Sequence, residues 1–329
     1  MSSLRKLITA VVSVGVVGAL LTGTAVAPAQ AANKKIAFVM GAESDPFVQA
    51  MKVGAEAAAK ANNIDLIWQG DPSEYSPATQ IPVVDQVLAQ KPDALVLIPT
   101  DPTALQASVA KAKAAGIPVI NVDTRVNDLT DVLSFITGDN ADGGAKAADA
   151  LAKAIKYTKG KTYQVVVGLT SATATTNVAR LDGFSKQIAK KYPGIKIVDK
   201  AYSQSQPAKA NTNVSNWLTK YPKLAGIFAI DGTNAAGAAA AIQAKGLKGK
   251  VALVGYDAYK ANVDLIGKGV FTALVAQDPA AEAKLAIEYL VKYFAGQTSG
   301  IKKEVVIPNV VLSKSSSKAD LAKYTYVQK

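Results

Sequence analysis

The sequence predicts an α/β protein in which parallel sheets are covered by helices. Short apolar runs alternate with helical segments over residues 36–295, and each run has the length of a strand. The run Ala94–Ile98 is apolar throughout, as expected of a strand that is covered on both faces. Repeated strand–helix units of this kind form parallel sheets with helices on both sides.

The predicted elements follow one another in a regular order. Pro46 is well placed for the first turn of a helix, where its missing N–H costs nothing. We expect strands at 36–40, 64–68, 94–98, 118–122, 164–169, 195–201, 226–230, 251–256 and 271–276. We expect helices at 46–62, 80–89, 103–115, 141–154, 177–191, 207–220, 233–245, 258–268 and 279–295.

Two halves of the chain share a local layout. In each half an apolar strand leads through a polar loop into a helix that contains a glycine. Ile36 is followed 18 residues later by Gly54, and Val165 is followed 18 residues later by Gly183. Glycine in a helix suits close packing against a neighbouring backbone. The sequence therefore favours two similarly built α/β lobes.

The N-terminus has the features of a signal peptide. Arg5 and Lys6 precede an apolar run over residues 7–21, and Ala29-Gln-Ala31 fits the small-residue rule for cleavage. A retained membrane anchor is the alternative, but the run is short and interrupted by Gly and Ser. We expect residues 1–31 to be removed near Ala32. The protein would then be periplasmic or extracellular and, without a cysteine at the cut, not a lipoprotein.

The amino-acid composition of the chain excludes several classes of function. The chain has no cysteine and no histidine, so it lacks a thiolate, a Cys-based metal site and a Ser-His-Asp triad. Its formal charge of +12 becomes +10 without Arg5 and Lys6, and lysines scattered among alanines are typical of a solvated surface. We expect no nucleic-acid partner. An enzyme that uses carboxylates or a lysine remains possible.

The stretch Gly138–Gly144 is rich in glycine, aspartate and asparagine. It lacks the dinucleotide-binding fingerprint and the spacing of a phosphate-binding lysine loop. We interpret it as a helix entry that connects the two lobes. The sequence therefore predicts no cofactor, no metal and no catalytic residues.

Polar side chains gather at the predicted carboxyl ends of the strands, where open α/β sheets bind ligands. Each of these aspartates could instead cap a helix, and Asp45 and Asp231 are well placed to do so. Asp257 could likewise cap the helix that follows it. Taken together, carboxylates, amides and one arginine suit a polyhydroxylated molecule, with an aromatic ring such as Phe47 covering its C–H face. The acidic residues concerned are Glu43, Asp45, Asp101, Asp123, Asp231 and Asp257.

An ordered series of short motifs resembles the sugar-binding periplasmic proteins of the ribose-binding type. No single motif is specific, but the series runs in order from Lys35 to Leu312. The motifs are Asp45-Pro-Phe47, Gly116-Ile-Pro-Val-Ile-Asn-Val-Asp123, Gly138-Asp-Asn140, Arg180-Leu-Asp-Gly-Phe184, Ile227-Phe-Ala-Ile-Asp231, Val254-Gly-Tyr-Asp257 and Ala276-Gln-Asp-Pro279.

The resemblance implies a fold and a set of contacts. The fold is the type I periplasmic binding protein fold, with two Rossmann-like lobes joined by a three-strand hinge near Gly138, Gln277 and Pro308. The N-terminal lobe would comprise 33–138 plus 278–308, and the C-terminal lobe 139–277 plus 309–329. The ligand-binding residues implied are Asp45, Phe47, Asp123, Asn177, Arg180, Asp231, Asp257 and Gln277, with the register of Asn177 and Arg180 open by a residue or two.

Departures from the family pattern leave the sugar undecided. The second aromatic residue after Pro46 is replaced by Val48, and Thr124 separates the aspartate from Arg125. We expect other side chains to supply the missing stacking or polar contacts. The candidates are Tyr202, Gln204 and Trp217.

The function implied is that of the extracellular substrate-binding subunit of an ABC importer. It would close around a small neutral carbohydrate or polyol, as a monomer, and deliver it to the membrane permease subunits. A ligand sensor for a chemoreceptor or sensor kinase is one alternative, and a secreted carbohydrate-active enzyme that uses aspartates is another. A transcriptional regulator would need a DNA-reading segment where the signal peptide lies.

Overall fold

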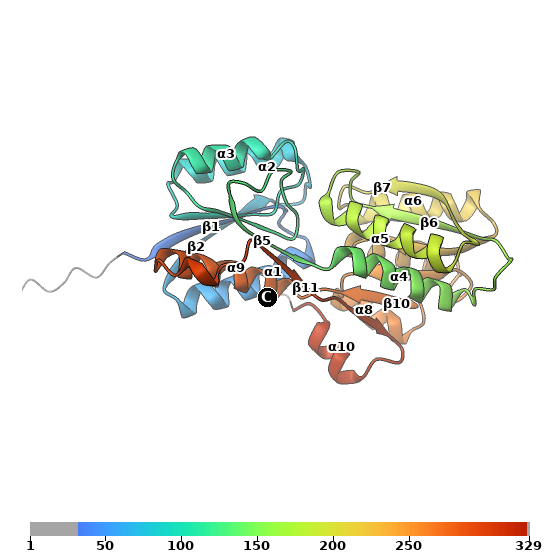
Figure 1. Cartoon of the computed structure of the whole chain (residues 1–329). Helices are drawn as coiled ribbons and strands as arrows, with labels where there is room; N and C mark the ends of the chain where they lie inside the picture. The colour runs from blue at the N-terminus through green and yellow to red at the C-terminus, as the bar shows by residue number, and fades with distance from the viewer. Residues whose placement is uncertain (1–31, 328–329) are drawn as a thin grey trace, which may run out of the picture. The chain divides into compact units, whose positions relative to one another are not determined.

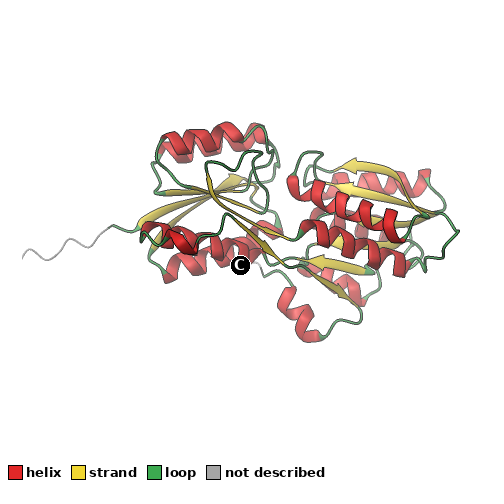
Figure 2. Ribbon diagram, in the orientation of Figure 1, coloured by secondary structure: helices red, strands yellow, loops and turns green. Residues whose placement is uncertain are grey.

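The computed structural model describes residues 32–327, and the predicted signal peptide lies outside that range. Two six-stranded sheets organise the described chain, each with helices on both faces (Figures 1 and 2). The order of the first sheet is β2 (Ile64–Asp71), β1 (Lys34–Ala42), β3 (Ala94–Leu97), β4 (Val119–Val122), β5 (Val132–Gly138) and β11 (Glu304–Ile307). The order of the second is β7 (Ile195–Tyr202), β6 (Tyr163–Leu169), β8 (Leu224–Ala229), β9 (Ala252–Tyr256), β10 (Ala273–Ala276) and β12 (Val310–Ser313).

The helices occupy the connections that the sequence predicts. Those around the first sheet are α1 (Pro46–Ala61), α2 (Pro77–Ala89), α3 (Gln106–Ala114) and α9 (Pro279–Phe294). Those around the second are α4 (Asn140–Ala154), α5 (Thr175–Lys191), α6 (Pro207–Lys220), α7 (Gly232–Ala244) and α8 (Lys260–Gly267), and α10 (Lys318–Tyr324) follows β12. Within residues 32–327, none of these helices has the length and apolar character needed to cross a membrane.

The chain passes between the two sheets three times, which confirms the predicted hinge. It leaves the first sheet after β5, returns between β10 and α9, and leaves again between β11 and β12. Gly138 ends β5 directly before the first crossing, and Gln277 and Pro308 lie in the second and third. The sheets are parallel as predicted except at one place, where β12 pairs with β10 in the antiparallel direction. The carboxyl ends of the parallel strands in both sheets face the pocket, so a chain that leaves the first sheet there through Pro308–Asn309 enters the second sheet in the opposite direction to its neighbours.

Four elements were missing from the prediction. Polar residues interrupt the apolar ones in β5 and α10, and β11 and β12 are only four residues long. β11 is an edge strand with partly exposed side chains, so it carries little of the apolar signal that marks a buried strand.

The two predicted helix glycines do pack closely. A Cβ on Gly54 of α1 would collide with the carbonyl oxygen of Ala280 on α9, and one on Gly183 of α5 would collide with that of Ala141 on α4. Each sheet is thus covered on one face by a helix pair that meets backbone to backbone. This packing holds the start of α9 and the start of α4, which both follow hinge crossings, in fixed positions.

Candidate functional site

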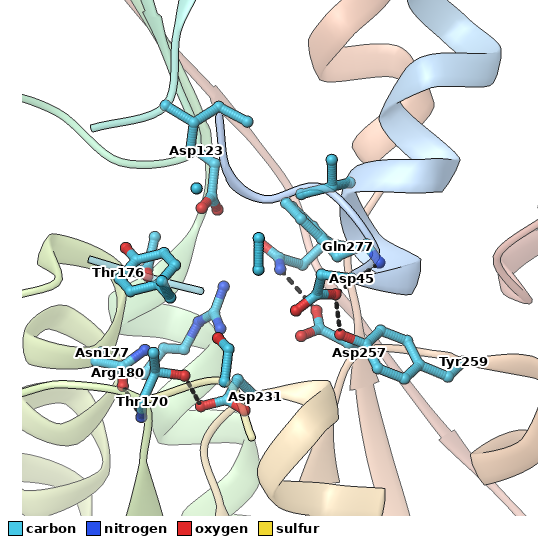
Figure 3. Close-up of a pocket in the computed structure, with 17 residues that line it drawn as sticks. Asp45, Asp123, Thr170, Thr176, Asn177, Arg180, Asp231, Asp257, Tyr259 and Gln277 are labelled. Atoms are coloured by element: carbon cyan, nitrogen blue, oxygen red, sulfur yellow. Dashed lines mark hydrogen bonds between the residues drawn. The ribbon is translucent and has the colours of Figure 1, made fainter. Parts of the chain in front are cut away.

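One pocket lies at the carboxyl ends of strands from both sheets, and all eight predicted site residues line it (Figure 3). Its volume is about 70 Å³, several times the ~10–15 Å³ that a single water needs. The site therefore has room for one small molecule. Besides the predicted residues it is lined by Gly41, Ala42, Val48, Tyr75, Ile98, Thr170, Thr176, Ser205 and Tyr259.

Asp45 joins the first sheet's side of the pocket to the second. Its carboxylate caps α1 by accepting a hydrogen bond of 2.9 Å from the backbone N–H of Phe47, as the sequence predicts. The hydroxyl of Tyr259 donates to the same oxygen, and the Thr233 hydroxyl lies 3.3 Å from the other. Burial raises the pKa of Asp45 to about 6, although the hydrogen bonds from Tyr259 and Phe47 oppose the shift.

Asp123 is the free carboxylate of the pocket. It follows β4 with a backbone φ of 60°, in the left-handed region that non-glycine residues rarely adopt. Its buried Oδ1 has no hydrogen-bond partner within the described chain. Burial raises its pKa to about 7, with Arg180 opposing the shift and Asp257 and Asp45 adding to it. Asp123 is therefore a buried hydrogen-bond acceptor to which no protein group donates, as expected of a residue that binds a ligand.

Arg180 and Asn177 both project from α5 into the pocket (Figure 3). The Nε of Arg180 donates to Asn140 at 2.8 Å and its Nη1 to the carbonyl oxygen of Ile230 at 3.1 Å. Its guanidinium carbon lies 3.8 Å from the ring centroid of Tyr256. These contacts fix the group while leaving N–H donors for a ligand.

The amide of Asn177 is held in the same way. Its Oδ1 accepts a 2.7 Å hydrogen bond from the backbone N–H of Thr170. The amide nitrogen has no hydrogen bond to any of the described residues and is therefore available as a donor.

Asp231 is held by the protein. It caps α7 through a 2.8 Å bond from Asn234 N, as the sequence predicts, and accepts from the Thr170 hydroxyl at 2.8 Å (Figure 3). Burial raises its pKa, against the hydrogen bonds from Asn234 and Thr170. Its role as a helix cap uses most of its capacity to accept hydrogen bonds.

Asp257 follows β9 with a φ of 65° and is 3% exposed. Its carboxylate accepts from the backbone N–H of Gly232 at 2.9 Å, from Gln277 Nε2 at 2.8 Å and from the Tyr326 hydroxyl at 3.1 Å. It does not cap the following helix, because α8 begins only at Lys260 and has Tyr259 at its N-cap position. Asp257 therefore ties the start of α7 and the second hinge crossing to the pocket.

The three candidates for substitute contacts do not line the pocket. Trp217 lies on the buried face of α6, Tyr202 is exposed on β7, and Gln204 accepts a hydrogen bond from Lys209. Glu43 and Asp101 also lie outside the pocket lining. Asp101 instead caps the turn that precedes α3, where its carboxylate accepts from the backbone N–H groups of Thr103 and Ala104.

Three aromatic side chains line the pocket, Phe47, which was predicted, and Tyr75 and Tyr259, which the sequence analysis missed. Tyr75 belongs to the loop that follows β2, so the rule that places sites beyond strand ends could have found it. Tyr259 lies two residues after Asp257 and could have been found in the same way. Tyr326 comes from the far end of the chain, and no local pattern connects it with the site.

The arrangement suits binding more than catalysis. Glycoside cleavage by carboxylates needs two of them free to act as acid and base or nucleophile. Asp45, Asp231 and Asp257 are each held by protein donors, which leaves Asp123 alone. In the part of the chain that the structure describes, no group of three or more acidic side chains is arranged to hold a metal ion.

Comparison with known proteins agrees with this geometry. The model of the periplasmic binding protein domain matches residues 36–298. The D-ribose/D-allose-binding protein of Pseudomonas aeruginosa is 32% identical over 286 residues, which cover 84% of this chain and 87% of that protein. The xylitol-binding protein of Mycolicibacterium smegmatis is 28% identical, over 83% of this chain and 76% of that protein.

Solved structures give the same result. An ABC transporter solute-binding protein from Agrobacterium vitis, bound with α-D-tagatopyranose, superposes with a TM-score of 0.84 at 32% identity. The superposition covers 90% of this chain and all of that one. With the fold, the three hinge crossings and the family match in agreement, the chain belongs to the periplasmic binding protein family, whose members are solute-binding proteins and not enzymes.

Proposed function

We propose that this chain is the sugar-binding subunit of an ABC importer and that its ligand is one small neutral sugar or polyol. The observation that carries the proposal is the pairing of a free acceptor, Asp123, with fixed donors on Arg180 and Asn177 across one small pocket. Adjacent hydroxyls of a sugar both donate and accept, so they match such a pair. Relatives named for ribose, allose, xylitol and tagatose have ligands of this class.

The proposed roles divide the lining residues into those that contact the sugar and those that shape the pocket around it. Asp123, Asn177 and Arg180 would bond the hydroxyls, and Phe47 with Tyr75 would cover the C–H faces of the ring. Asp45, Asp231, Asp257 and Gln277 would shape the pocket and add acceptors at its edge. Four carboxylates against one guanidinium disfavour an anionic ligand such as a sugar phosphate.

Closure of two lobes would complete the site. The proposed lobes are residues 33–138 plus 278–308, and 139–277 plus 309–329, each containing one of the two sheets. Since the lining residues come from both, an open form would hold only half of the contacts. Hinge closure around ligand is the usual motion of such proteins. We further propose that the mature protein is a monomer that reaches the permease outside the cytoplasm without a lipid anchor.

A panel of pentoses, hexoses and polyols tests the proposal by thermal shift. A true ligand at about 100 times its Kd is expected to stabilise the protein by about 2.7 kcal/mol. Small-angle scattering with that ligand should show a smaller radius of gyration, and mass spectrometry should recover it unchanged. Chemical turnover that disappears in Asp123→Asn would favour the enzyme instead.

Sugar affinity is expected to fall about tenfold between pH 8 and pH 6. The pKa of Asp123 is about 7 without ligand, and only the ionised carboxylate accepts hydroxyl donors on both oxygens, so binding at lower pH must release a proton. The free energy of unfolding of the unliganded protein depends on pH in the opposite sense, because the pKa of Asp123 is higher in the folded state than in the unfolded chain. The contribution of Asp123 to this free energy is fully present below about pH 4 and is lost as pH rises through about 7.

Calorimetric titration across this pH range measures the affinity, with Asp123→Asn as the control that should flatten the profile. An affinity in the wild-type protein that does not change with pH would show that Asp123 does not exchange its proton on binding.

A further inference from the structure

The net positive charge of the chain lies on one side of the hinge. Residues 139–277 and 309–329 carry 23 Lys and Arg against 9 Asp and Glu, a formal charge of +14. Residues 33–138 and 278–308 carry 12 against 16, a formal charge of −4. A difference of this size between two similarly built halves indicates a partner for the basic one.

Within the basic half, the lysines gather at the end opposite the ligand pocket. Helices α4 to α8 end, and the parallel strands of the second sheet begin, at that end, which we call the basic pole. It consists of residues 153–162, 190–194, 220–223, 245–251 and 268–272. These segments contain no Asp or Glu, and their 12 lysines are all exposed. The lysines are 153, 156, 159, 161, 190, 191, 220, 223, 245, 248, 250 and 268.

Most of these charges are unpaired. Lys191 lies 3.5 Å from Asp149 and Lys220 2.9 Å from Asp199, while the other ten form no ion pair with any described residue. Lysine in the last turn of a helix is favoured by the helix dipole, which accounts for some of them. It does not account for the lysines of the loops beyond, such as Lys159, Lys161 and Lys248.

The equivalent end of the first sheet serves as an internal comparison. Its segments 60–63, 89–93, 113–118, 128–131 and 295–303 carry five lysines together with Asp93, Asp128 and Asp131. The same helix dipoles act there, yet the charges are mixed. The basic pole is therefore a property of this half and not of the fold.

A shallow cavity lies within the basic pole. It has a volume of about 310 Å³ and includes Lys156, Lys250, Tyr163 and the backbone of Gly249 and Gly269, with no carboxylate in its lining. A cavity with two ammonium groups and exposed backbone suits a phosphate-bearing group. The ring of the nearby Tyr157 packs against those of Tyr163 and Tyr192, with centroids 5.7 and 5.2 Å apart.

We propose that the basic pole binds the phosphate headgroups of an anionic membrane surface, with one headgroup seated between Lys156 and Lys250. Exposed lysines act as hydrated point charges without directional demands, as in polybasic segments that hold proteins at anionic bilayers. Each lysine near such a surface strengthens binding by about fivefold. This contact would keep the protein at the membrane with its ligand pocket at the opposite end of the strands.

Co-sedimentation of the mature protein with phosphatidylcholine vesicles, with and without phosphatidylglycerol, tests the proposal. Binding is expected only with phosphatidylglycerol and should weaken steeply with salt. The double variant Lys156→Gln/Lys250→Gln should bind about 25-fold more weakly. The matched control Lys60→Gln/Lys302→Gln makes the same charge change at exposed positions of the other half, and less than a twofold effect is expected.

Three outcomes would overturn the proposal. Equal losses in the two double variants would mean that only the overall charge matters. No binding to phosphatidylglycerol at physiological salt would remove the membrane partner, and tighter binding to soluble polyphosphate than to vesicles would point to an anionic polymer. Sugar titration of the same variants should be unchanged, so failure here leaves the proposed import function untouched.

Discussion

Replacing Asp123 with Asn is expected to weaken sugar binding by about 30- to 1,000-fold, or about 2–4 kcal/mol, with little loss of unliganded stability. The carboxylate has no protein donor to lose, since its buried oxygen is unpartnered. Asn tolerates the left-handed backbone at φ 60°, so the loop should keep its shape. The variant replaces a charged acceptor by a neutral amide, and the sugar hydroxyls lose their strongest partner.

Asp231→Ala is the control, because the carboxylate of Asp231 is held by protein groups. It should lower the free energy of unfolding by about 1–2 kcal/mol through the lost helix cap and have the smaller effect on affinity. Calorimetry and urea unfolding on both variants separate the two roles. If Asp123→Asn bound sugar normally but unfolded more easily, the carboxylate would be structural.

The fold was largely predictable because it depends on local, repeated signals. Buried parallel strands such as β3 are continuous apolar runs, and helices such as α1 begin with an Asp-Pro pair that specifies a cap and a first turn. β5 escaped because polar residues interrupt its apolar ones, and β11 and β12 escaped because they are short and pair with strands that are not their neighbours in sequence. β11, for example, pairs with a strand more than 160 residues earlier in the chain.

The sequence predicted eight of the residues that line the pocket but not the role that each one has there. The rule that ligands lie beyond strand ends located Asp45, Asp123, Asp231 and Asp257, because it depends only on chain direction. It does not show which carboxylate is free. Asp123 and Asp257 each come directly after a strand and share the same unusual φ, yet one has no protein partner and the other has three. The difference arises from Gly232, Gln277 and Tyr326, which only the folded chain brings together.

Tyr326 illustrates the part that sequence reasoning could not reach. It follows α10, pairs with Tyr259 in an isolated bridge and lies with its ring centroid 6.0 Å from that of Phe47. Its hydroxyl accepts from the backbone N–H of Gln277 at 3.1 Å and donates to Asp257. One residue near the C-terminus thus touches α1, the second hinge crossing and a pocket carboxylate.

The second large effect is expected from Asp257→Asn, which should lower the free energy of unfolding by about 2–4 kcal/mol even without ligand. The carboxylate accepts from three donors in a 3% exposed position. An amide in its place offers one acceptor and turns N–H groups toward the remaining donors. Sugar affinity should fall as well, because Gln277 and the start of α7 lose the contact that fixes them.

Tyr326→Phe tests one part of this effect, because it removes only one of the three donors to Asp257. It should lower the free energy of unfolding by about 1 kcal/mol. Tyr324→Phe is the matched control, because the Tyr324 hydroxyl has no hydrogen bond to the described residues, and we expect no change from it. Urea unfolding without ligand, followed by calorimetric titration, measures both quantities for each variant. A large loss of affinity in Asp257→Asn with unaltered unfolding would show that its carboxylate faces the sugar directly, as Asp123 is proposed to do, and that its bonds to Gly232, Gln277 and Tyr326 contribute little to the fold.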